Sequence, residues 1–426
     1  MTGIVNRAFK LIRNAGRPYQ FGFVQGHAHL DLENLQVIKR VLEAGNEVDN
    51  KCIMANYETS FARLVGPGAG VSFASGRMAF YALMKVLGIG DGDEVILPGF
   101  TCAVMPNAIM RTGARPVYAD IDKSTFGSDA KTIEKVISKR TKLIVAQHSF
   151  GIPCNIPNII EIGKRHGIFV MEDCAITFDS SINGIKVGNW GDAAIFSTDH
   201  TKPLNTVIGG LLYTKEKNLY NKIRDFSDSL SQLDRDHQKR LFGQFMFERK
   251  FYTPERYPHA KVMNKLKTLV KKAPLSRGLF TFLEADYNRP RSVTSIVYPY
   301  PAKMPSFLAQ LGLFELERWG NERQKRKKLL SDYLSVMNKS NLKSYLPKAY
   351  HDPALEIVPL RFAFTYPDAV SSMTKMARFI DIGGIWFRQP IICSPRGPEE
   401  FGYLKGSCSN AEEITSTIIN WPCSRD

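Results

Sequence analysis

Lys202 has the clearest capacity for covalent chemistry in this chain because of the residues around it. It follows the apolar run Ala193–Phe196 in a short turn and precedes Gly209–Gly210. A lysine sheltered in such a turn has a lowered pKa, which frees its nucleophilic amine. Solvent exposure is the competing interpretation, and it is the usual state of a single lysine.

Asp173 is a second candidate, since it comes soon after the apolar run Ile168–Met171. Ligands of parallel sheets bind at the carboxyl ends of strands, where we expect this carboxylate to lie. A carboxylate there could keep a pyridine nitrogen protonated, because opposite charges favour each other's ionised forms. A protonated pyridine ring withdraws electrons from a carbanion, as in pyridoxal phosphate (PLP) chemistry. The alternative is an aspartate that caps the next turn.

Two serine positions suit a phosphate group. Ser75-Gly76-Arg77 opens a helix in the segment FASGRMAF, and a helix start presents free N–H groups and a positive dipole end. Ser75 could equally be an ordinary helix cap. Ser197 comes five residues before Lys202 and could donate a hydrogen bond to the same phosphate.

The elements that must position these side chains alternate along the chain. We predict strands at 94–97, 116–119, 143–146, 168–171, 193–196 and 211–213, and helices at 101–112, 129–138 and 156–166. Short, continuously apolar strands separated by helices indicate a mainly parallel sheet covered on both faces.

The rest of the chain differs in composition. We predict an N-terminal arm and large domain at 1–215, a basic helical insertion at 216–290 and a smaller C-terminal α/β domain at 291–426. Apolar residues at helical spacing run from Leu308 to Trp319, and a heavily charged stretch, Asn321–Lys328, follows them.

Lysine and arginine outnumber aspartate and glutamate by 57 to 41, which gives a net charge of +16. Such a charge favours phosphorylated substrates or an anionic membrane surface. We find no nucleic-acid-binding motif and therefore expect no nucleic-acid partner. The seven cysteines include no C-x-x-C pair, so we expect neither a metal site nor a disulfide framework.

We expect a cytoplasmic protein, since no stretch approaches the ~20 apolar residues that span a bilayer and the N-terminus lacks a signal-peptide core. Attachment to the inner membrane surface is a further hypothesis. Basic and apolar residues alternate over 261–283, the pattern of a helix lying on anionic lipid. A solvated helix covering the domain explains the same pattern.

The ordered motifs resemble the DegT/StrS family of sugar aminotransferases. The resemblance rests on SG-x-x-A, GDEVILPGFT, GARPVYADID, FGIPCNI, HGIFVMEDCA and the Gly-Gly pair after Lys202. It covers about residues 55–215, and it resumes at KMPSFLAQLGLFELERW and NAEEITSTIINWP. It implies an aspartate-aminotransferase-like fold (PLP fold type I): a three-layer domain with a mainly parallel sheet, plus a smaller C-terminal domain.

The resemblance also implies roles for individual residues. Lys202 would bind PLP covalently and Asp173 would face the ring nitrogen. Ser197 and the Ser75-Gly76-Arg77 turn would hold the phosphate, and Phe100 or Cys102 would lie against the ring. The expected reaction moves an amino group, usually from L-glutamate, to a keto group of a nucleotide-linked sugar, in a homodimer with its site at the subunit interface.

Several positions depart from the family pattern. Ile176 replaces a Gln or His near the ring hydroxyl, Cys102 replaces an aromatic residue, and Pro301–Met304 replaces an Asn-x-Arg-Met segment. These changes keep open a non-catalytic regulatory or binding protein. A PLP-dependent sugar dehydratase is a third interpretation, but related dehydratases carry His at the lysine position. We expect His148 to be structural and leave His200 as either a substrate contact or a turn residue.

Overall fold

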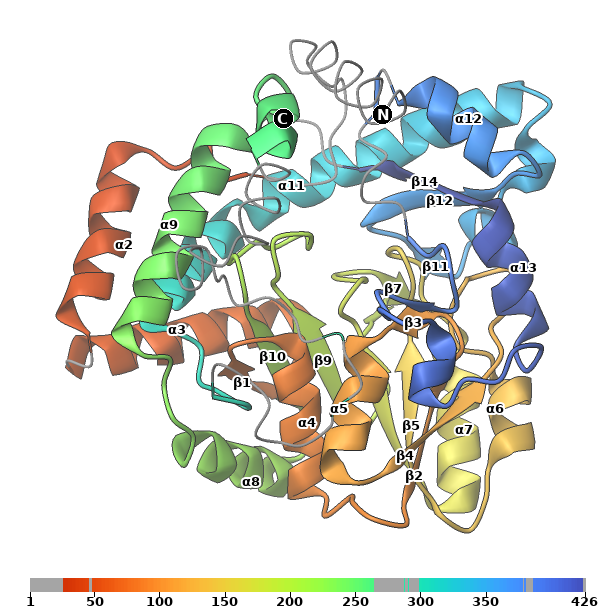
Figure 1. Cartoon of the computed structure of the whole chain (residues 1–426), viewed down its shortest axis with the longest axis horizontal. Coiled ribbons are helices and arrows are strands. Elements are labelled where there is room, and N and C mark those ends of the chain that lie inside the picture. Colours follow the sequence, from red (N-terminus) through yellow and green to blue (C-terminus); the bar gives the residue numbers. More distant parts are fainter. Residues whose placement is uncertain are drawn as a thin grey trace, which may run out of the picture.

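A seven-stranded sheet forms the centre of the computed structural model (Figure 1), which describes residues 26–45, 48–263, 287, 290, 299–377, 379–380 and 386–423. The strands of this sheet, in spatial order, are β1 (Ala69–Phe73), β10 (Gly210–Thr214), β9 (Ala193–Ser197), β6 (Phe169–Asp173), β5 (Thr141–Gln147), β2 (Glu94–Pro98) and β4 (Arg115–Ala119). Strand β10 pairs antiparallel with both neighbours, and the other pairs are parallel. The predicted mainly parallel sheet is confirmed.

Helices cover both faces of the sheet, as the apolar strands require. The helices that pack beside it are α4 (Gly76–Val86), α5 (Val104–Thr112), α6 (Ala130–Val136), α7 (Ile156–His166) and α8 (Lys217–Asp228). In β2, Val95 and Leu97 join the larger core with α4 and α5, while Ile96 joins a second core with α6 and α7. This alternation produces the three layers seen in Figure 1.

One predicted helix starts later than expected. Thr101–Cys102 forms a short strand, β3, instead of the first turn of the helix, and α5 begins at Val104. Strand β3 pairs in parallel with β13 (Ile391–Ile392). The N–H of Thr101 donates to the carbonyl of Pro390 at 2.9 Å. The helix boundary was wrong because this partner strand lies far away in the sequence.

A single long helix, α11 (Ser306–Lys339), joins two parts of the molecule. Its first half packs against α2 (Leu32–Ala44) and α3 (Val48–Val65). Figure 1 shows its other end near β12 (Arg361–Thr365) and β14 (Ile418–Pro422). There the Tyr333 ring stacks on Phe362 with centroids 4.9 Å apart. The charged stretch 321–328 continues the helix, and inside it Glu322 and Arg326 form a buried ion pair at 2.7 Å.

The C-terminal elements pair β12 with β14 in a small antiparallel sheet. The remaining elements of this part are α12 (Ala369–Met376), α13 (Ser409–Thr417), β11 (Leu355–Glu356) and the short 3-10 helices 343–345, 348–351 and 398–401. Strand β11 pairs with β7 (Ser181–Ile182), which also pairs with β8 (Ile185–Lys186). A smaller α/β unit therefore follows α11, although the division at residue 290 remains a prediction.

The described part of the basic region after the sheet contains α8 and α9 (Arg235–Phe251) with non-helical segments between the helices, and it contains no strand. Within the described residues, no helix has both the length and the apolar character needed to cross a bilayer. Most of the 261–283 segment, for which a membrane contact was predicted, lies outside the described residues, as does the N-terminal arm through residue 25.

Candidate active site

A cavity of about 480 Å³ opens at the carboxyl ends of β5, β6 and β9. Each of these strands contributes its last residue to the wall: Gln147, Asp173 and Ser197. This is the edge at which parallel sheets bind ligands, and the size suits a small cofactor and its substrate. The predicted site residues brought together here are Ser75, Gly76, Arg77, Cys102, Asp173, Ser197 and Lys202.

Phe100 is the predicted site residue that the structure places elsewhere. Its side chain is fully buried and does not line the cavity. The ring packs edge-on against Phe387, with centroids 4.7 Å apart, and close to Phe150. Phe100 is therefore part of the core behind the site, and Phe387 lines the wall in its place.

Lys202 lies in a loop fixed by its own hydrogen bonds. Its N–H donates to the carbonyl of Asp199 at 2.8 Å, and the hydroxyls of Thr198 and Thr206 are 2.6 Å apart at the base of the loop. The amine faces the cavity, where burial lowers its pKa. Nearby Asp199 opposes this shift, because a negative charge favours the protonated amine. The result is an amine nearer to the neutral, nucleophilic form than that of an exposed lysine.

Asp173 ends β6 with only 4% of its surface exposed. One carboxylate oxygen accepts a hydrogen bond from the N–H of Ala175 at 2.9 Å. Burial raises the pKa of Asp173, and the opposite charges of Lys202 and His148 partly offset that shift. A cationic group bound in the cavity would therefore stabilise the ionised carboxylate.

The start of α4 lies directly against Ser197. Ser75 caps this helix, as its hydroxyl accepts from the N–H of Met78 at 3.4 Å. A Cβ on Gly76 would come within 3.3 Å of the Ser197 Cβ, and a Cβ on Gly210 would clash with the Gly76 backbone nitrogen. The glycines thus allow the helix start and Ser197 to approach closely, and together they form a cradle suited to a phosphate.

A buried network behind the cavity holds these strand ends in register. Glu172 accepts hydrogen bonds from the N–H groups of Gly188, Trp190 and Gly191 at 2.7–2.8 Å. Its other contact is Nε2 of His148, at 3.0 Å. The Glu172, His148 and Cys174 ligand atoms lie within 4.8 Å of one another, but the backbone donors already occupy the carboxylate. The network gives His148 the structural role expected of it.

Trp386 is a site residue that the sequence analysis missed. The amine of Lys202 lies 4.6 Å from the centre of its ring, and the guanidinium of the buried Arg361 lies 3.7 Å from the same ring. The positive charge of Arg361 further lowers the pKa of Lys202. The only local signal was an aromatic pair, Trp386-Phe387, after two glycines in the C-terminal part.

Helix α9 supplies a second wall that local motifs did not indicate. Leu241, Gln244 and Glu248 line the cavity from this helix. The Gln244 amide donates to Glu248 at 2.6 Å, and the Asn205 amide, from the lysine loop, donates to the other oxygen at 3.3 Å. Helix α9 therefore joins the basic region to the loop that positions Lys202.

The positions that depart from the family pattern have defined surroundings. Ile176 is buried and lines the cavity, so that part of the wall is apolar. The segment 301–304 packs behind the Ser75 turn, where the Ala302 carbonyl accepts from the N–H of Ala74 at 2.9 Å. His200 also lines the cavity, with Nδ1 3.3 Å from a carboxylate oxygen of Asp199.

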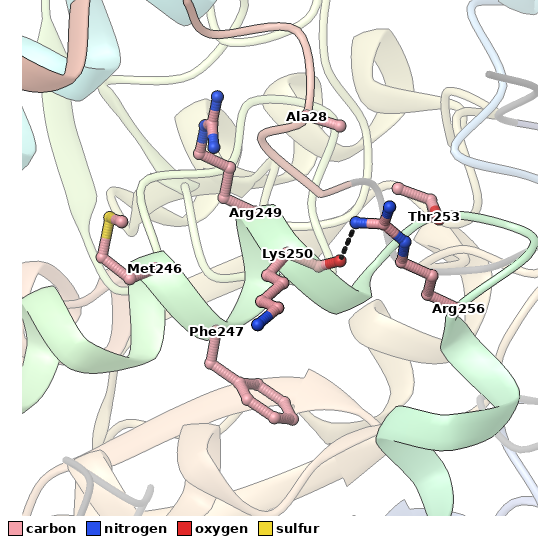
Figure 2. Close-up of a pocket in the computed structure, with 7 residues that line it drawn as sticks. All are labelled: Ala28, Met246, Phe247, Arg249, Lys250, Thr253 and Arg256. Atoms are coloured by element: carbon pink, nitrogen blue, oxygen red, sulfur yellow. Dashed lines mark hydrogen bonds between the residues drawn. The ribbon is translucent and has the colours of Figure 1, made fainter. Parts of the chain in front are cut away.

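A separate hollow of about 520 Å³ lies over the far end of α9 (Figure 2). Its lining residues are Ala28, Met246, Phe247, Arg249, Lys250, Thr253 and Arg256. Both of its arginines are used internally: Arg249 donates to the Leu30 carbonyl at 2.7 Å and Arg256 to the Lys250 carbonyl at 3.2 Å. The hollow is basic, but it lacks the combination of amine, carboxylate and helix start found in the main cavity.

Comparison with known proteins supports the same classification. The model of the DegT/DnrJ/EryC1/StrS aminotransferase family matches residues 29–246, just over half of the chain. GDP-perosamine synthase of Escherichia coli O157:H7 is 34% identical over 187 residues, which cover 44% of this chain and 51% of the relative. UDP-N-acetyl-3-dehydro-alpha-D-glucosamine 3-aminotransferase of Acidithiobacillus ferrooxidans is 38% identical over 168 residues, covering 39% and 46%.

These matches span only about half the length of the curated relatives. A Streptococcus pneumoniae protein described as a putative sugar aminotransferase, solved in its PLP form, superposes with a TM-score of 0.68 at 18% identity, covering 96% of this chain and 93% of that one. That likeness establishes the aspartate-aminotransferase-like fold over nearly the whole chain. The order of motifs, the fold and the family match agree, and the chain belongs to the DegT/DnrJ/EryC1/StrS aminotransferase family.

Proposed function

We propose that this protein is a PLP-dependent aminotransferase that moves an amino group from L-glutamate to a keto group on a nucleotide-linked sugar. The observation that carries the proposal is one cavity wall that combines Lys202, Asp173 and the Ser75–Ser197 cradle. Each of these suits a different part of PLP: its aldehyde, its ring nitrogen and its phosphate. Three other cavities in the part of the chain that the structure describes lack this combination.

The residues present fit the cofactor. Asp173 is a buried carboxylate whose pKa is raised by burial, and a protonated ring nitrogen is the partner that would keep it ionised. The close approach of Gly76 to Ser197 leaves a helix start and a hydroxyl for a phosphate. Phe387 and Trp386 offer aromatic surface in the same wall, and Cys102 also lines it.

The chain's own groups can then act in turn. Bound PLP supplies an electron-withdrawing ring that stabilises negative charge next to the transferred nitrogen. Burial lowers the pKa of Lys202, so its Nζ could bind the cofactor covalently. When released, it could accept the proton from the donor's α-carbon and, in the second half of the transfer, donate a proton to the acceptor carbon that gains the nitrogen. Trp386 covers this amine on one side and limits the access of water to it.

We base the proposed class of amino acceptor on two relatives and on the cavity wall formed by α9. Two relatives of this chain are named for nucleotide-sugar chemistry. On the α9 side, Gln244 and Glu248 provide hydrogen-bonding groups of the kind that sugar hydroxyls use. Arg77, at the phosphate cradle, adds a positive charge suited to a phosphorylated acceptor. We also propose a homodimer, as the family resemblance implies.

The test is amino transfer by the purified chain with PLP, L-glutamate and a panel of 3-keto and 4-keto nucleotide-sugars. We expect 2-oxoglutarate and an amino-sugar to form in equal amounts with at least one acceptor. Lys202→Ala should lower the rate by roughly 1000-fold or more, while Lys131→Ala, an exposed lysine on α6, should not.

Two other outcomes would contradict the aminotransferase proposal and indicate a different function. Loss of a sugar hydroxyl without net transfer of nitrogen would indicate a dehydratase. A chain that takes up no PLP and transfers no nitrogen would indicate the regulatory or binding role that Ile176 left open.

A further inference from the structure

Two cysteines from distant parts of the chain meet at the wall of the cavity. Cys102 lies in β3, and Cys393 directly follows β13. These strands pair in parallel, with Cys102 opposite Ile392, and the N–H of Ala103 donates to the Ile392 carbonyl at 2.9 Å. Paired strands run about 4.8 Å apart, so Cys393, one residue beyond the position opposite Cys102, lies on the neighbouring chain segment. A disulfide spans Cα separations of roughly 4.4–6.8 Å.

The backbone at Cys393 leaves the regular strand conformation. Its φ is +69°, in the left-handed region, so the regular alternation of side chains ends at this residue. Both cysteines line the cavity, and each shifts the pKa of the other. The two thiols therefore belong to one wall of the same cavity, on neighbouring strands.

The two thiols differ in reactivity. Cys102 lowers the pKa of Cys393, and the charge of Lys202 and the hydroxyl of Tyr287 lower it further. The pKa of Cys102 is instead raised, first by Cys393 and then by burial. Cys393 is also exposed, whereas Cys102 is partly buried. Cys393 is the thiol that a solvent oxidant reaches first, because it is the more exposed of the two, and the thiolate is the reactive form.

The other cysteines lack this arrangement. Cys154, Cys174, Cys408 and Cys423 are buried, and burial raises the pKa of the last three. Cys52 is exposed on α3, on a different element from either member of the pair. Among the seven cysteines, Cys393 is thus the exposed thiol that lines the cavity together with a second cysteine.

We propose that Cys102 and Cys393 form a peroxide-reactive dithiol that closes to a disulfide beside Lys202. The Cys393 thiolate attacks one oxygen of hydrogen peroxide, an S–O bond forms as the O–O bond breaks, and the leaving hydroxide takes a proton to become water. Cys102 then attacks the Cys393 sulfur, the S–S bond forms, and the departing hydroxide leaves as water with the Cys102 proton. The two thiols lose two electrons in total, and the peroxide gains them.

The experiment uses the full chain without added PLP. It is treated with hydrogen peroxide, alkylated and digested without reductant, and the peptides are identified by mass spectrometry. We expect a cross-linked pair of peptides containing Cys102 and Cys393, two hydrogens lighter than the separate peptides, which dithiothreitol reverses. The protein should lose two titratable thiols.

Single variants separate the two roles. Cys393→Ser should slow thiol loss at least tenfold. Cys102→Ser should yield no disulfide but a Cys393 sulfenic acid that dimedone captures. Cys52→Ser, which removes an exposed thiol elsewhere, should leave the cross-link unchanged.

An absent cross-link, or oxidation of Cys52 as fast as that of Cys393, would overturn the proposal. The readout is a peptide mass obtained without cofactor, so the result for the dithiol does not depend on whether the protein transfers amino groups.

Discussion

The N–H of Lys202 donates a hydrogen bond to the carbonyl of Asp199 at 2.8 Å, which closes a tight turn. Within this turn the Asp199 carboxylate acts as a counter-charge to the Lys202 amine. Two opposing effects meet at the amine. Burial lowers the pKa of Lys202, and the Asp199 carboxylate opposes that shift. Burial is the larger effect, which leaves the amine more readily deprotonated than a lysine in water.

Asp199→Asn should therefore lower the pKa of Lys202 further, because the opposing charge is removed while the amide can still accept from Thr201. The amine reacts with an aldehyde only when neutral. The pH midpoint for covalent attachment of PLP should then move to lower pH by roughly one unit. Absorbance titration from acid to alkaline pH measures this midpoint. Asp332→Asn, on the exposed face of α11, serves as control. A midpoint that rises or stays fixed would contradict this electrostatic account.

Asp173→Asn should leave covalent attachment intact but reduce the rate of amino transfer by roughly 10²–10³-fold. A neutral amide cannot stabilise a protonated ring nitrogen as a buried carboxylate does. Rates measured at saturating PLP separate this effect from weaker binding. Asp236→Asn, in the exposed first turn of α9, should behave as wild type. Near-normal turnover by the Asp173→Asn variant would show that this carboxylate does not act on the ring.

Gly210→Ala should weaken PLP binding by roughly 10- to 100-fold. The added Cβ would clash with the Gly76 nitrogen and push the start of α4 away from Ser197. Equilibrium dialysis against PLP gives the affinity. Gly243→Ala is a matched control, because a Cβ there meets nothing within 4 Å. It should bind PLP normally and raise helix stability by about 0.5–1 kcal/mol. Equal PLP affinity in both variants would argue against the cradle.

Glu172→Ala should destabilise the fold by about 3–5 kcal/mol. Removing the carboxylate leaves the N–H groups of Gly188, Trp190 and Gly191 without their acceptor. A lower urea midpoint would report the loss. Glu134→Ala removes an ion pair to Arg165 on a side chain that is 43% exposed, and its cost should stay below about 1 kcal/mol. Similar midpoints for the two variants would mean that the Glu172 network has little effect on stability.

Local sequence rules were sufficient where the site is built from strand ends. Asp173 and Ser197 end neighbouring parallel strands, so the rule for ligand sites at carboxyl ends was enough to predict that they lie near each other. Ser75 followed from helix-start chemistry. The edge strand β1, by contrast, was not predicted, since its segment Ala69–Phe73 contains two small residues and a serine.

The parts of the site that the sequence did not predict depend on pairing between distant segments. Phe100 was expected at the ring because it lies close to Cys102, the position where the family carries an aromatic residue. The pairing of β3 with β13 instead brings Trp386 and Phe387 to the wall. Gln244 and Glu248 come from a helix whose apolar spacing gave no indication that it faces a cavity. Such contacts depend on tertiary packing, which single-sequence periodicity does not encode.

The most direct test of the central claim is to find which residue binds PLP. The protein is incubated with PLP, reduced with borohydride to make any lysine linkage permanent, digested and mapped by mass spectrometry. The account predicts that the label lies on the peptide containing Lys202 and disappears in Lys202→Ala. Label on another lysine, or equal labelling of the variant, would contradict it.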